Sequence, residues 1–430
     1  MRRLPWILFA LALTTGSLAC DPADGDGDGT TGWFLILGGE EPDEGGYPIH
    51  PHCLYRVPLA PGPGAEALYC PDDARWIQQA LAPRLGHDRT LLVVEVDAHS
   101  GIYSTEFPIW EPWIQELHLI DLTTGDDAVL AHWLADSAEG AEPTGSVSRA
   151  LTLDDGRVAV HWTLPEVHGG RGEEVVVVDS NGQAGDDLAG TLDSKGLVDV
   201  LPSGDLLIRA ADDEGRLRLL AVDPDGTATR EFALPAASPL AADLETDDIL
   251  VDPAGERALL LVDGTPTIAG ADGFTQMDRP LEWGEHLMGW AGDGGVLVEH
   301  DSIAHWDGTD GAVLTEIGLI EGIDGTSWGC ATHPDGVAVF EIWSEDTSSG
   351  VEGLGWYQDG QLTACEMDLW SVSDPTWAHG TDGPVAVAHD NDRDSPYRNQ
   401  IFACQPDGSA SEVLSAHGLR GNVLPSDRIW

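Results

Sequence analysis

The chain has 430 residues, of which 75 are acidic and 20 are lysine or arginine, and its formal net charge at pH 7 is −55. Nucleic acid is excluded as a partner because phosphate binding requires a basic surface, and an anionic membrane surface would repel the folded part of the chain. The acidic residues are spread along the whole sequence. This favours a general adaptation to salty surroundings over an acidic patch that attracts a cation or a basic protein.

The first 19 residues have the layout of a secretory signal peptide. Arg2 and Arg3 form a basic start, and residues 6–13 form an apolar stretch that is too short to span a bilayer as a helix. The segment SLAC at 17–20 resembles the lipobox of bacterial lipoproteins, in which the cysteine is lipidated and becomes the new N-terminus. The resemblance implies a lipid on Cys20, and a plain signal peptide with a chance cysteine is the alternative.

Residues 20–32 are rich in Asp and Gly and cannot bury a core. We therefore expect a disordered tether between the lipid and a folded domain that covers residues 33–430. No later run reaches about 18 apolar residues, so no transmembrane segment is predicted. Together these features predict an exported protein of the bacterial cell envelope, which touches the membrane only through its N-terminal lipid.

Five cysteines follow Cys20, which is an odd number. Cys53 and Cys70 are equidistant from a turn centred between Pro61 and Gly62. In a regular hairpin they would face each other across the ladder, close enough to form a disulfide. At least one of the other three is expected to be free. These three are Cys330, Cys365 and Cys404.

Short alternating runs of apolar residues, each interrupted by a tight turn, recur along the chain. The turns lie near residues 155, 204, 254, 294, 336 and 383. Further hairpins such as LRLLAVDPDGTATREF fall between them, which gives four strands for each period of about 40 to 50 residues. This pattern predicts an all-β fold, a single β-propeller of four-stranded blades. We expect eight blades, with seven as the alternative because 247–280 is a weak repeat, and a short helix at 72–82.

The two ends of the chain supply complementary parts of one blade. The last ten residues, GNVLPSDRIW, are similar to the internal segment 198–208 and predict a first strand, a turn and the start of a second strand. The strand GWFLIL, which starts at Gly32, has the pattern of a second strand without a first. We therefore expect the ring to close by pairing of the N- and C-terminal segments, which removes free sheet edges.

The repeat pattern of residues 33–430 resembles that of bacterial β-propeller lipoproteins and exported TolB-like propellers, with Pro-Asp-Gly turns at 334–336 and 406–408. Residues 121–133 are also similar to one repeat of the quinoprotein-like eight-bladed propellers, which include a barrel-assembly lipoprotein. The resemblance implies an envelope propeller. One such repeat does not predict a quinone cofactor.

One face of the predicted propeller carries short Asp-Gly turns, and the other carries the long connections that follow the second and fourth strands of each blade. Long loops on a rigid scaffold are where function usually lies, so we expect the second face to bind a partner. Its candidate residues are His99, Trp110, Trp113, His161, His300, Asp301 and His389.

The predicted function is that of a monomeric, lipid-anchored binding scaffold without catalytic residues, whose ligand is a protein, a small molecule or a carbohydrate. One alternative is a hydrolase or lyase with a histidine and carboxylate site at the mouth of the central channel. Such an enzyme requires at least two of these groups within hydrogen-bond reach in one pocket. The other alternative is an envelope assembly factor.

A calcium site is the candidate for metal binding. Asp390, Asp392 and Asp394 alternate within the connection 389–400, as carboxylates do at the start of a calcium loop. Two arginines lie in the same connection. A salt-linked loop without a metal is therefore the alternative.

Overall fold

All the elements described in the structure, a computed structural model, are β-strands. They belong to one unit, Thr31–Trp430. Among the described residues, no helix has the length and apolar character that crossing a bilayer requires. The described residues are 32–40, 53–59, 65–71, 75–81, 89–97, 113–135, 146–163, 173–179, 183–188, 193–236, 248–283, 285–291, 294–299, 303–308, 315–318, 325–326, 331–333, 335–344, 351–369, 375–381, 383–389, 401–414 and 419–423.

Within these residues the strands form eight antiparallel sheets of three to five strands. The sheet with the order β3-β2-β1-β32 contains β1 (Trp33–Glu40), β2 (Cys53–Pro58), β3 (Glu66–Tyr69) and β32 (Leu419–Val423). The next sheets along the chain contain β4 (Arg75–Leu81), β5 (Arg89–Asp97), β6 (Trp113–Asp121) and β7 (Asp127–Ala135), then β8 (Ser146–Thr152), β9 (Val158–Thr163) and β10 (Glu173–Val178). They are followed by β11 (Asp193–Val200), β12 (Leu206–Ala211), β13 (Leu217–Val222) and β14 (Ala228–Phe232).

The second half of the chain continues in the same way. Two sheets contain β15 (Leu250–Val251), β16 (Arg257–Val262), β17 (Thr265–Gly270) and β18 (Gly273–Gln276), then β19 (His286–Trp290), β20 (Val296–Glu299), β21 (Ile303–Trp306) and β22 (Thr315–Gly318). The five-stranded sheet contains β23 (Gly325–Thr326), β24 (Ala331–His333), β25 (Val337–Ser344), β26 (Val351–Gln358) and β27 (Gln361–Leu369). The last sheet contains β28 (Thr376–Trp377), β29 (Ala386–His389), β30 (Ile401–Cys404) and β31 (Ala410–Leu414).

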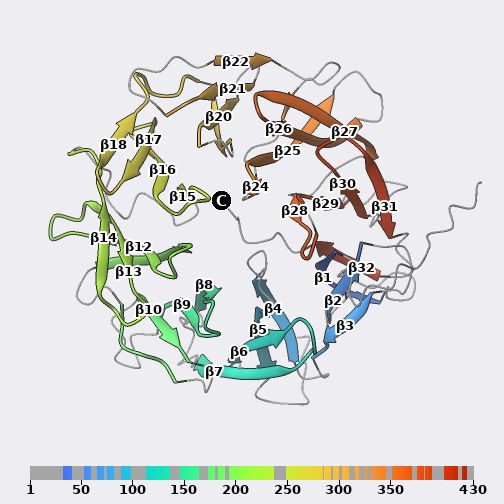
Figure 1. Ribbon diagram of the computed structural model, residues 1–430. Coiled ribbons are helices and arrows are strands. Elements are labelled where there is room, and N and C mark those ends of the chain that lie inside the picture. Colours follow the sequence, from blue (N-terminus) through green and yellow to red (C-terminus); the bar gives the residue numbers. More distant parts are fainter. Residues whose placement is uncertain are drawn as a thin grey trace, which may run out of the picture. The chain divides into compact units, whose positions relative to one another are not determined.

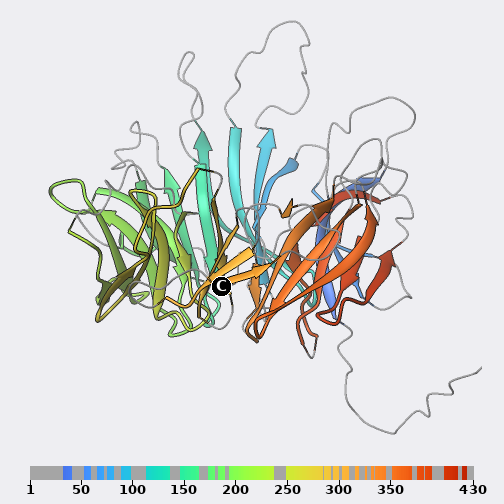
Figure 2. The ribbon, with the colours of Figure 1, turned by 90° about the horizontal axis from the view of Figure 1, so that it is seen from above.

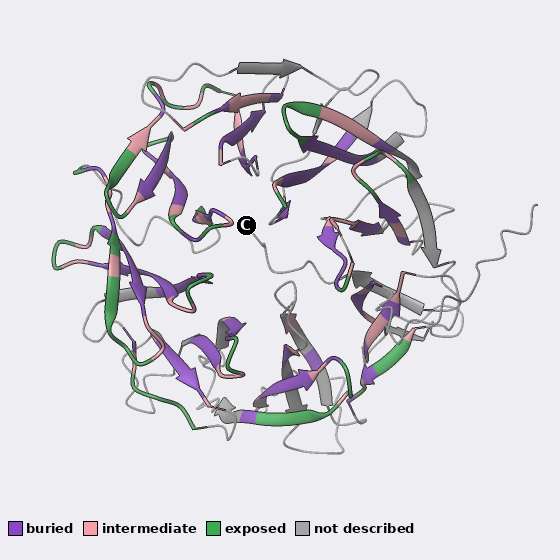
Figure 3. Ribbon diagram, viewed as in Figure 1, coloured by how far each residue is buried: buried purple, intermediate pink, exposed green. Residues whose placement is uncertain are grey.

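The sheets follow one another in chain order around a common centre, with strands such as β8, β15 and β28 nearest to it (Figure 1). Figure 2 shows the same strands after a rotation of 90° about the horizontal axis. Most buried residues lie on the inner and middle strands, whereas the outer strands β7 and β14 are largely exposed (Figure 3). The fold therefore buries its apolar residues between sheets.

Eight hydrophobic clusters fill the spaces between neighbouring sheets. In one of them Leu207 and Phe232 of sheet β11–β14 pack with Leu260 of sheet β15–β18, and all three side chains are buried. Because strand residues alternate between two faces, each sheet contributes one set of side chains to the cluster before it and one to the cluster after it. Removal of this apolar surface from water stabilises the arrangement.

The tight turns depend on Asp and Gly at fixed positions. Between β13 and β14 the amide of Gly226 donates to the carbonyl of Asp223 at 2.9 Å, and Gly226 has a φ of 95°, which side chains with a Cβ rarely adopt. The carboxylate of Asp223 accepts hydrogen bonds from the amides of Asp225 and Thr227 at 3.0 and 2.9 Å. Turns of this kind fix the register of each hairpin.

Most of the predicted hairpins are confirmed. The six predicted turns join β8 to β9, β11 to β12, β15 to β16, β19 to β20, β24 to β25 and β28 to β29. The weak repeat at 247–280 contains β15 to β18. The predicted helix at 72–82 is wrong, because Arg75–Leu81 forms β4 and pairs with β5. There, burial of Ile77 between sheets outweighs the helix preference of the Gln-Gln-Ala-Leu segment.

The first and last described strands lie side by side. β1 pairs with β32 over Ile36 to Glu40, and β32 is the edge strand of that sheet opposite to β3. Trp33 and His379 also exchange two backbone hydrogen bonds of 2.9 and 2.7 Å, and their rings stack with centroids 4.3 Å apart. A buried cluster that includes Phe34 and Val387 packs the first sheet against the last. We call the Trp33–His379 contact the clasp.

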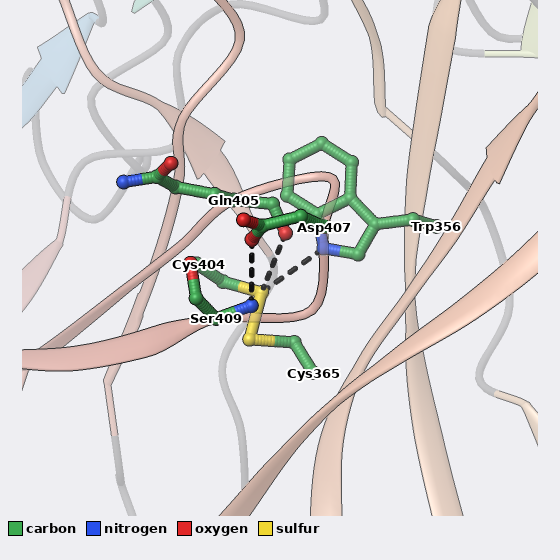
Figure 4. The surroundings of a disulfide bond; sticks show 6 residues. All are labelled: Trp356, Cys365, Cys404, Gln405, Asp407 and Ser409. Atoms are coloured by element: carbon green, nitrogen blue, oxygen red, sulfur yellow. Dashed lines mark hydrogen bonds between the residues drawn. A yellow bond between two sulfur atoms is a disulfide. The ribbon is translucent and has the colours of Figure 1, made fainter.

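The described residues contain two disulfides, one within a sheet and one between two sheets. The predicted bond between Cys53 and Cys70 is confirmed and closes the β2–β3 hairpin within one sheet. A second bond, between Cys365 on β27 and Cys404 on β30, joins two sheets and is fully buried. The indole Nε1 of Trp356 donates to the Cys404 sulfur at 3.0 Å (Figure 4). The sequence left the partners of Cys365 and Cys404 open.

Candidate functional site

The candidate site lies where the second strand of each sheet ends and the third begins. We call this end, marked by the C-terminal ends of β9, β12 and β20, the long-connection face. The opposite end is the short-turn face, and turns such as 201–205 mark it. Charged and polar side chains are buried near both ends. Those near the short-turn face include Asp252 and His333, and those near the long-connection face include His161 and Glu299.

His161 is the predicted binding-face residue whose side chain the structure describes. The backbones of Trp113 and His389 lie at the start of β6 and the end of β29, which are positions on the same face. The other predicted positions lie outside the described residues. These are Cys20, His99, Trp110, His300, Asp301, Asp390, Asp392 and Asp394.

His161 lies on β9 directly opposite Arg149 on β8. Leu151 and Ala159, two residues away on the same strands, belong to the cluster that packs on sheet β11–β14. Because side chains alternate along a strand, Arg149 and His161 lie on that same side of their sheet. Arg209, on β12 of the neighbouring sheet, lies close enough for its charge to act on His161, and we call Arg149, His161 and Arg209 the cationic cluster.

Burial and two positive charges determine the state of His161. The side chain is 6% exposed, and its burial, together with Arg209 and Arg149, lowers the pKa of His161 from 6.5 to about 4. The imidazole is therefore neutral at pH 7, next to two guanidinium groups. Eight of the 20 lysine and arginine residues lie between Arg149 and Arg230, against 16 of the 75 acidic residues. This segment thus contains two fifths of the basic residues of the chain and about a proportionate share of the acidic ones.

A different pair lies in sheet β19–β22. Glu299, at the end of β20, is 8% exposed and lies directly opposite His286 on β19. Two sheets, β11–β14 and β15–β18, separate this pair from His161 in chain order. The structure therefore does not bring His161 and Glu299 together as one acid–base pair.

Buried polar groups near the short-turn face stabilise turns. Asp252 accepts hydrogen bonds from the amides of Glu256 and Arg257 at 2.8 and 3.1 Å, and it pairs with the Arg257 guanidinium at 2.8 Å. His333 Nδ1 accepts the amide of Asp335 at 3.1 Å, and burial lowers the pKa of His333. These contacts explain the burial of Asp252 and His333 without a ligand.

Sequence reasoning missed His118, which is completely buried on β6. Its Nδ1 lies 2.7 Å from Asp127 and its Nε2 lies 3.1 Å from Glu116, and its ring packs against Tyr69 of the neighbouring sheet. The available signal was the alternation of Glu116, His118 and Ile120 along β6. In a sequence, however, a polar pair within an outer hairpin is typical of a solvent-exposed face. His118 therefore joins two sheets through side-chain contacts that only the fold creates.

The outer edge of sheet β11–β14 forms an open groove of about 770 Å³. Arg216 donates to the carbonyl of Ala236 at 2.5 Å, and Arg218 forms a bidentate pair with Glu231 at 2.8 and 2.9 Å. Within the described residues, no group of three or more His, Cys, Asp or Glu side chains is placed to hold a metal ion. The predicted calcium loop lies outside these residues.

No family model matches the chain, and no curated protein matches it. Similar solved structures include a puromycin hydrolase, which is 16% identical with a TM-score of 0.41, and a post-proline cleaving enzyme from Rickettsia typhi, which is 9% identical with a TM-score of 0.47. These matches cover 80% and 84% of this chain, which spans only 55% and 58% of those two chains. TolB from Acinetobacter baumannii is 13% identical with a TM-score of 0.32, over 74% of this chain and 77% of TolB. The resemblance to TolB proteins that the repeats indicated is therefore found among solved structures, as a likeness of fold.

Proposed function

We propose that the chain is an exported, lipid-anchored β-propeller of the bacterial cell envelope that acts as a binding scaffold through its long-connection face. In this proposal the eight sheets are eight blades, and the ring closes through the β1–β32 pair and the clasp. The cluster that packs Phe34 against Val387 supports closure, because it joins the first sheet to the last.

The cationic cluster is the observation that carries the binding role. Burial beside two guanidiniums disfavours the protonated form of the imidazole, and residues with strongly shifted pKa values concentrate at functional sites. A neutral imidazole and two guanidiniums suit a carboxylate or phosphate group of a ligand.

Site-specific photo-crosslinking in the native envelope tests which face binds. A photo-reactive residue replaces Glu214, which is exposed between β12 and β13 on the long-connection face, or Asp225, which is exposed in the short turn between β13 and β14. We expect a discrete crosslinked partner from position 214 and none from position 225. Equal crosslinking from both positions, or crosslinking from 225 alone, would contradict the proposal.

A matched pair of variants tests the cationic cluster. Arg149→Gln and Arg157→Gln remove the same charge from the same sheet, but Arg157 lies in the short turn before β9 and pairs with Asp155. Only Arg149→Gln should weaken the crosslink from position 214. If Arg157→Gln weakens it equally, the effect comes from net charge and the cluster is not the site.

The lipid anchor is tested by mass spectrometry of the mature protein from a host that processes lipoproteins. We expect a mature chain that begins at Cys20 and carries the mass of the lipid. A free amino terminus at another residue would disprove the anchor and leave the binding face untouched.

A further inference from the structure

Trp283 is almost completely exposed. The described residues include three exposed large hydrophobic side chains, and Trp283 is 98% exposed, against 48% for Val129 and 44% for Phe274. An indole is among the largest apolar groups, and tryptophan is enriched at the centres of protein interfaces. An indole that is held entirely in water therefore calls for an explanation that a partly exposed valine does not.

The segment that carries Trp283 is fixed to the sheet. The amides of Met277 and Leu281 donate to the carbonyls of Pro266 and Gly264 at 3.0 and 2.8 Å. Gly264 lies in the turn between β16 and β17, which is on the long-connection face. The connection from β18 to β19 therefore runs back along β17 and carries Trp283 on that face.

A closed turn holds the indole outward. The amide of Glu285 donates to the carbonyl of Glu282 at 3.0 Å, which makes Trp283 the second residue of a four-residue turn. Arg279 locks this turn with two hydrogen bonds of 2.6 and 2.8 Å to the Glu285 carboxylate, which also accepts the amide of Glu282 at 2.6 Å. The backbone of such a preorganised turn loses little conformational entropy when the side chain it carries binds a partner.

The charges around Trp283 are negative. Between Asp263 and Glu285 the sequence has five acidic residues and one basic residue, Arg279, whose guanidinium is bound to Glu285. Asp263, Asp278 and Glu282 are exposed. A cationic group attracts both the face of an indole and a flanking carboxylate, and tryptophan is the best of the aromatic residues for this contact.

We propose that Trp283 is the anchor for a lysine- or arginine-rich segment of a protein partner, with the cation on the indole face and Glu282 as its flanking charge. The net charge of −55 brings such a segment to the molecule, and the fixed indole gives it one place to bind. This inference rests on the proposed role of the long-connection face and adds a second contact there, for a cationic segment of the partner, to the anionic group that the cationic cluster suits.

Fluorescence anisotropy of a labelled hexa-arginine peptide tests the anchor on the whole chain. A protein of this charge attracts the peptide everywhere, so the informative variant is Trp283→Ala, which leaves the charge unchanged. We expect it to weaken binding about threefold to tenfold at about 0.15 M salt, and by a similar factor at about 0.5 M, where exposed charges are screened. Trp283→Phe should retain part of the affinity.

Two controls separate the indole from its surroundings. Phe274→Ala removes another exposed aromatic ring and should leave the affinity unchanged. Glu282→Gln should weaken binding about twofold at the lower salt concentration and have no effect at the higher one. Both results support Trp283 as the specific contact.

Equal peptide affinities of wild type and Trp283→Ala at both salt concentrations would overturn the proposal. If wild type forms dimers in sedimentation and Trp283→Ala is monomeric, the indole binds a second copy and the basic partner is wrong. Crosslinking from position 214 gives an independent reading. If that crosslink persists while Trp283→Ala has no effect on the peptide, the face still binds and only its anchor is wrong.

Discussion

The inner strand of sheet β11–β14 has eight residues, whereas that of sheet β28–β31 has two. Sheet β11–β14 contains no cysteine and is held by ladders and by buried residues such as Phe232. Sheet β28–β31 is tied to its neighbours by the Cys365–Cys404 disulfide on one side and by the clasp on the other. The two sheets differ in what holds them, although both have four strands.

The difference follows from how much each sheet can bury and pair by itself. Long strands with tight Asp-Gly turns supply many ladder hydrogen bonds and two apolar faces, so sheet β11–β14 needs no cross-link. Short strands supply fewer of both. In such a sheet, strand pairing alone only weakly opposes opening. The disulfide and the clasp then limit the open conformations. The four predictions that follow test this division, from the largest expected effect to the smallest.

Deletion of residues 418–430 removes β32 and leaves the edge of β1 without its pairing partner. We expect loss of cooperative unfolding, or aggregation, because an open edge pairs with other chains. Calorimetry and light scattering measure both. Deletion of 424–430, which keeps β32, is the control. A chain without 418–430 that melts like the full chain would show that the β1–β32 pair contributes little.

Phe232→Ala tests the sheet that apolar packing holds. Phe232 is 2% exposed between sheets β11–β14 and β15–β18, so the free energy of unfolding should fall by about 3–5 kcal/mol. Urea denaturation measures the loss, which should be the same with and without reductant. Phe274→Ala, at an exposed position, should change stability by less than about 0.5 kcal/mol. A loss for Phe232→Ala that appears only under reductant would contradict the comparison.

Replacement of both Cys365 and Cys404 by Ala tests the sheet that the cross-link holds. The bond joins residues 39 apart in sequence, against 17 for Cys53–Cys70, and the longer loop gains more freedom when it opens. We expect a loss of about 2–4 kcal/mol in the free energy of unfolding, and a smaller loss for the Cys53→Ala, Cys70→Ala double variant. Melting temperatures of the two double variants decide the order. The reverse order would show that the buried bond is not the main support of this sheet.

Acid should lower stability at a different place in the molecule, the contact between sheets β8–β10 and β11–β14, where His161 is buried. The pKa of His161 is about 4 in the folded chain and 6.5 in the unfolded chain, so the unfolded chain binds more protons between these two pH values. Stability is therefore complete above about pH 6.5 and is lost as the pH falls towards 4. Between pH 7 and about pH 5 the wild type should lose on the order of 1–2 kcal/mol more than His161→Gln.

Urea denaturation of both proteins at each pH measures this difference, and the carboxylates that titrate in both proteins cancel. Equal losses in wild type and His161→Gln would show that His161 takes up its proton without opposing the fold. The cationic cluster would then be less buried than its position between the sheets indicates.

Local pattern was enough to predict the hairpins. The spacing of apolar residues and the Asp-Gly turns near 155 and 204 place β8–β9 and β11–β12 correctly, because a tight turn and strict alternation fix the register over a few residues. Cys53 and Cys70 were predictable for the same reason, since one hairpin brings them together. The strand within 72–82 was not predictable, because its residues suit a helix and the strand exists only through pairing with β5.

The candidate site was predictable only in part. The sequence identified His161 as a polar residue close to the end of a strand on the face of long connections. Arg149 and Arg209 were not identified, because their effect on His161 depends on the register of β8 with β9 and on the packing of the neighbouring sheet. Trp283 was not identified either, since its exposure is visible only in the structure, where the other tryptophan side chains that are described, such as Trp290 and Trp306, are buried or partly buried.

The sequence by itself determined the all-β class, the repeated hairpins, the first disulfide and the strong negative charge, because each depends on residues close together in the chain or on composition alone. The sequence also predicted that the two ends of the chain pair. The tertiary structure decided the Cys365–Cys404 bond, the burial of His118 and the exposure of Trp283. Each of these depends on the position of one sheet beside another. Alternation along a strand says which residues share a face, but only the packed neighbour decides which of them are buried, charged or left in water.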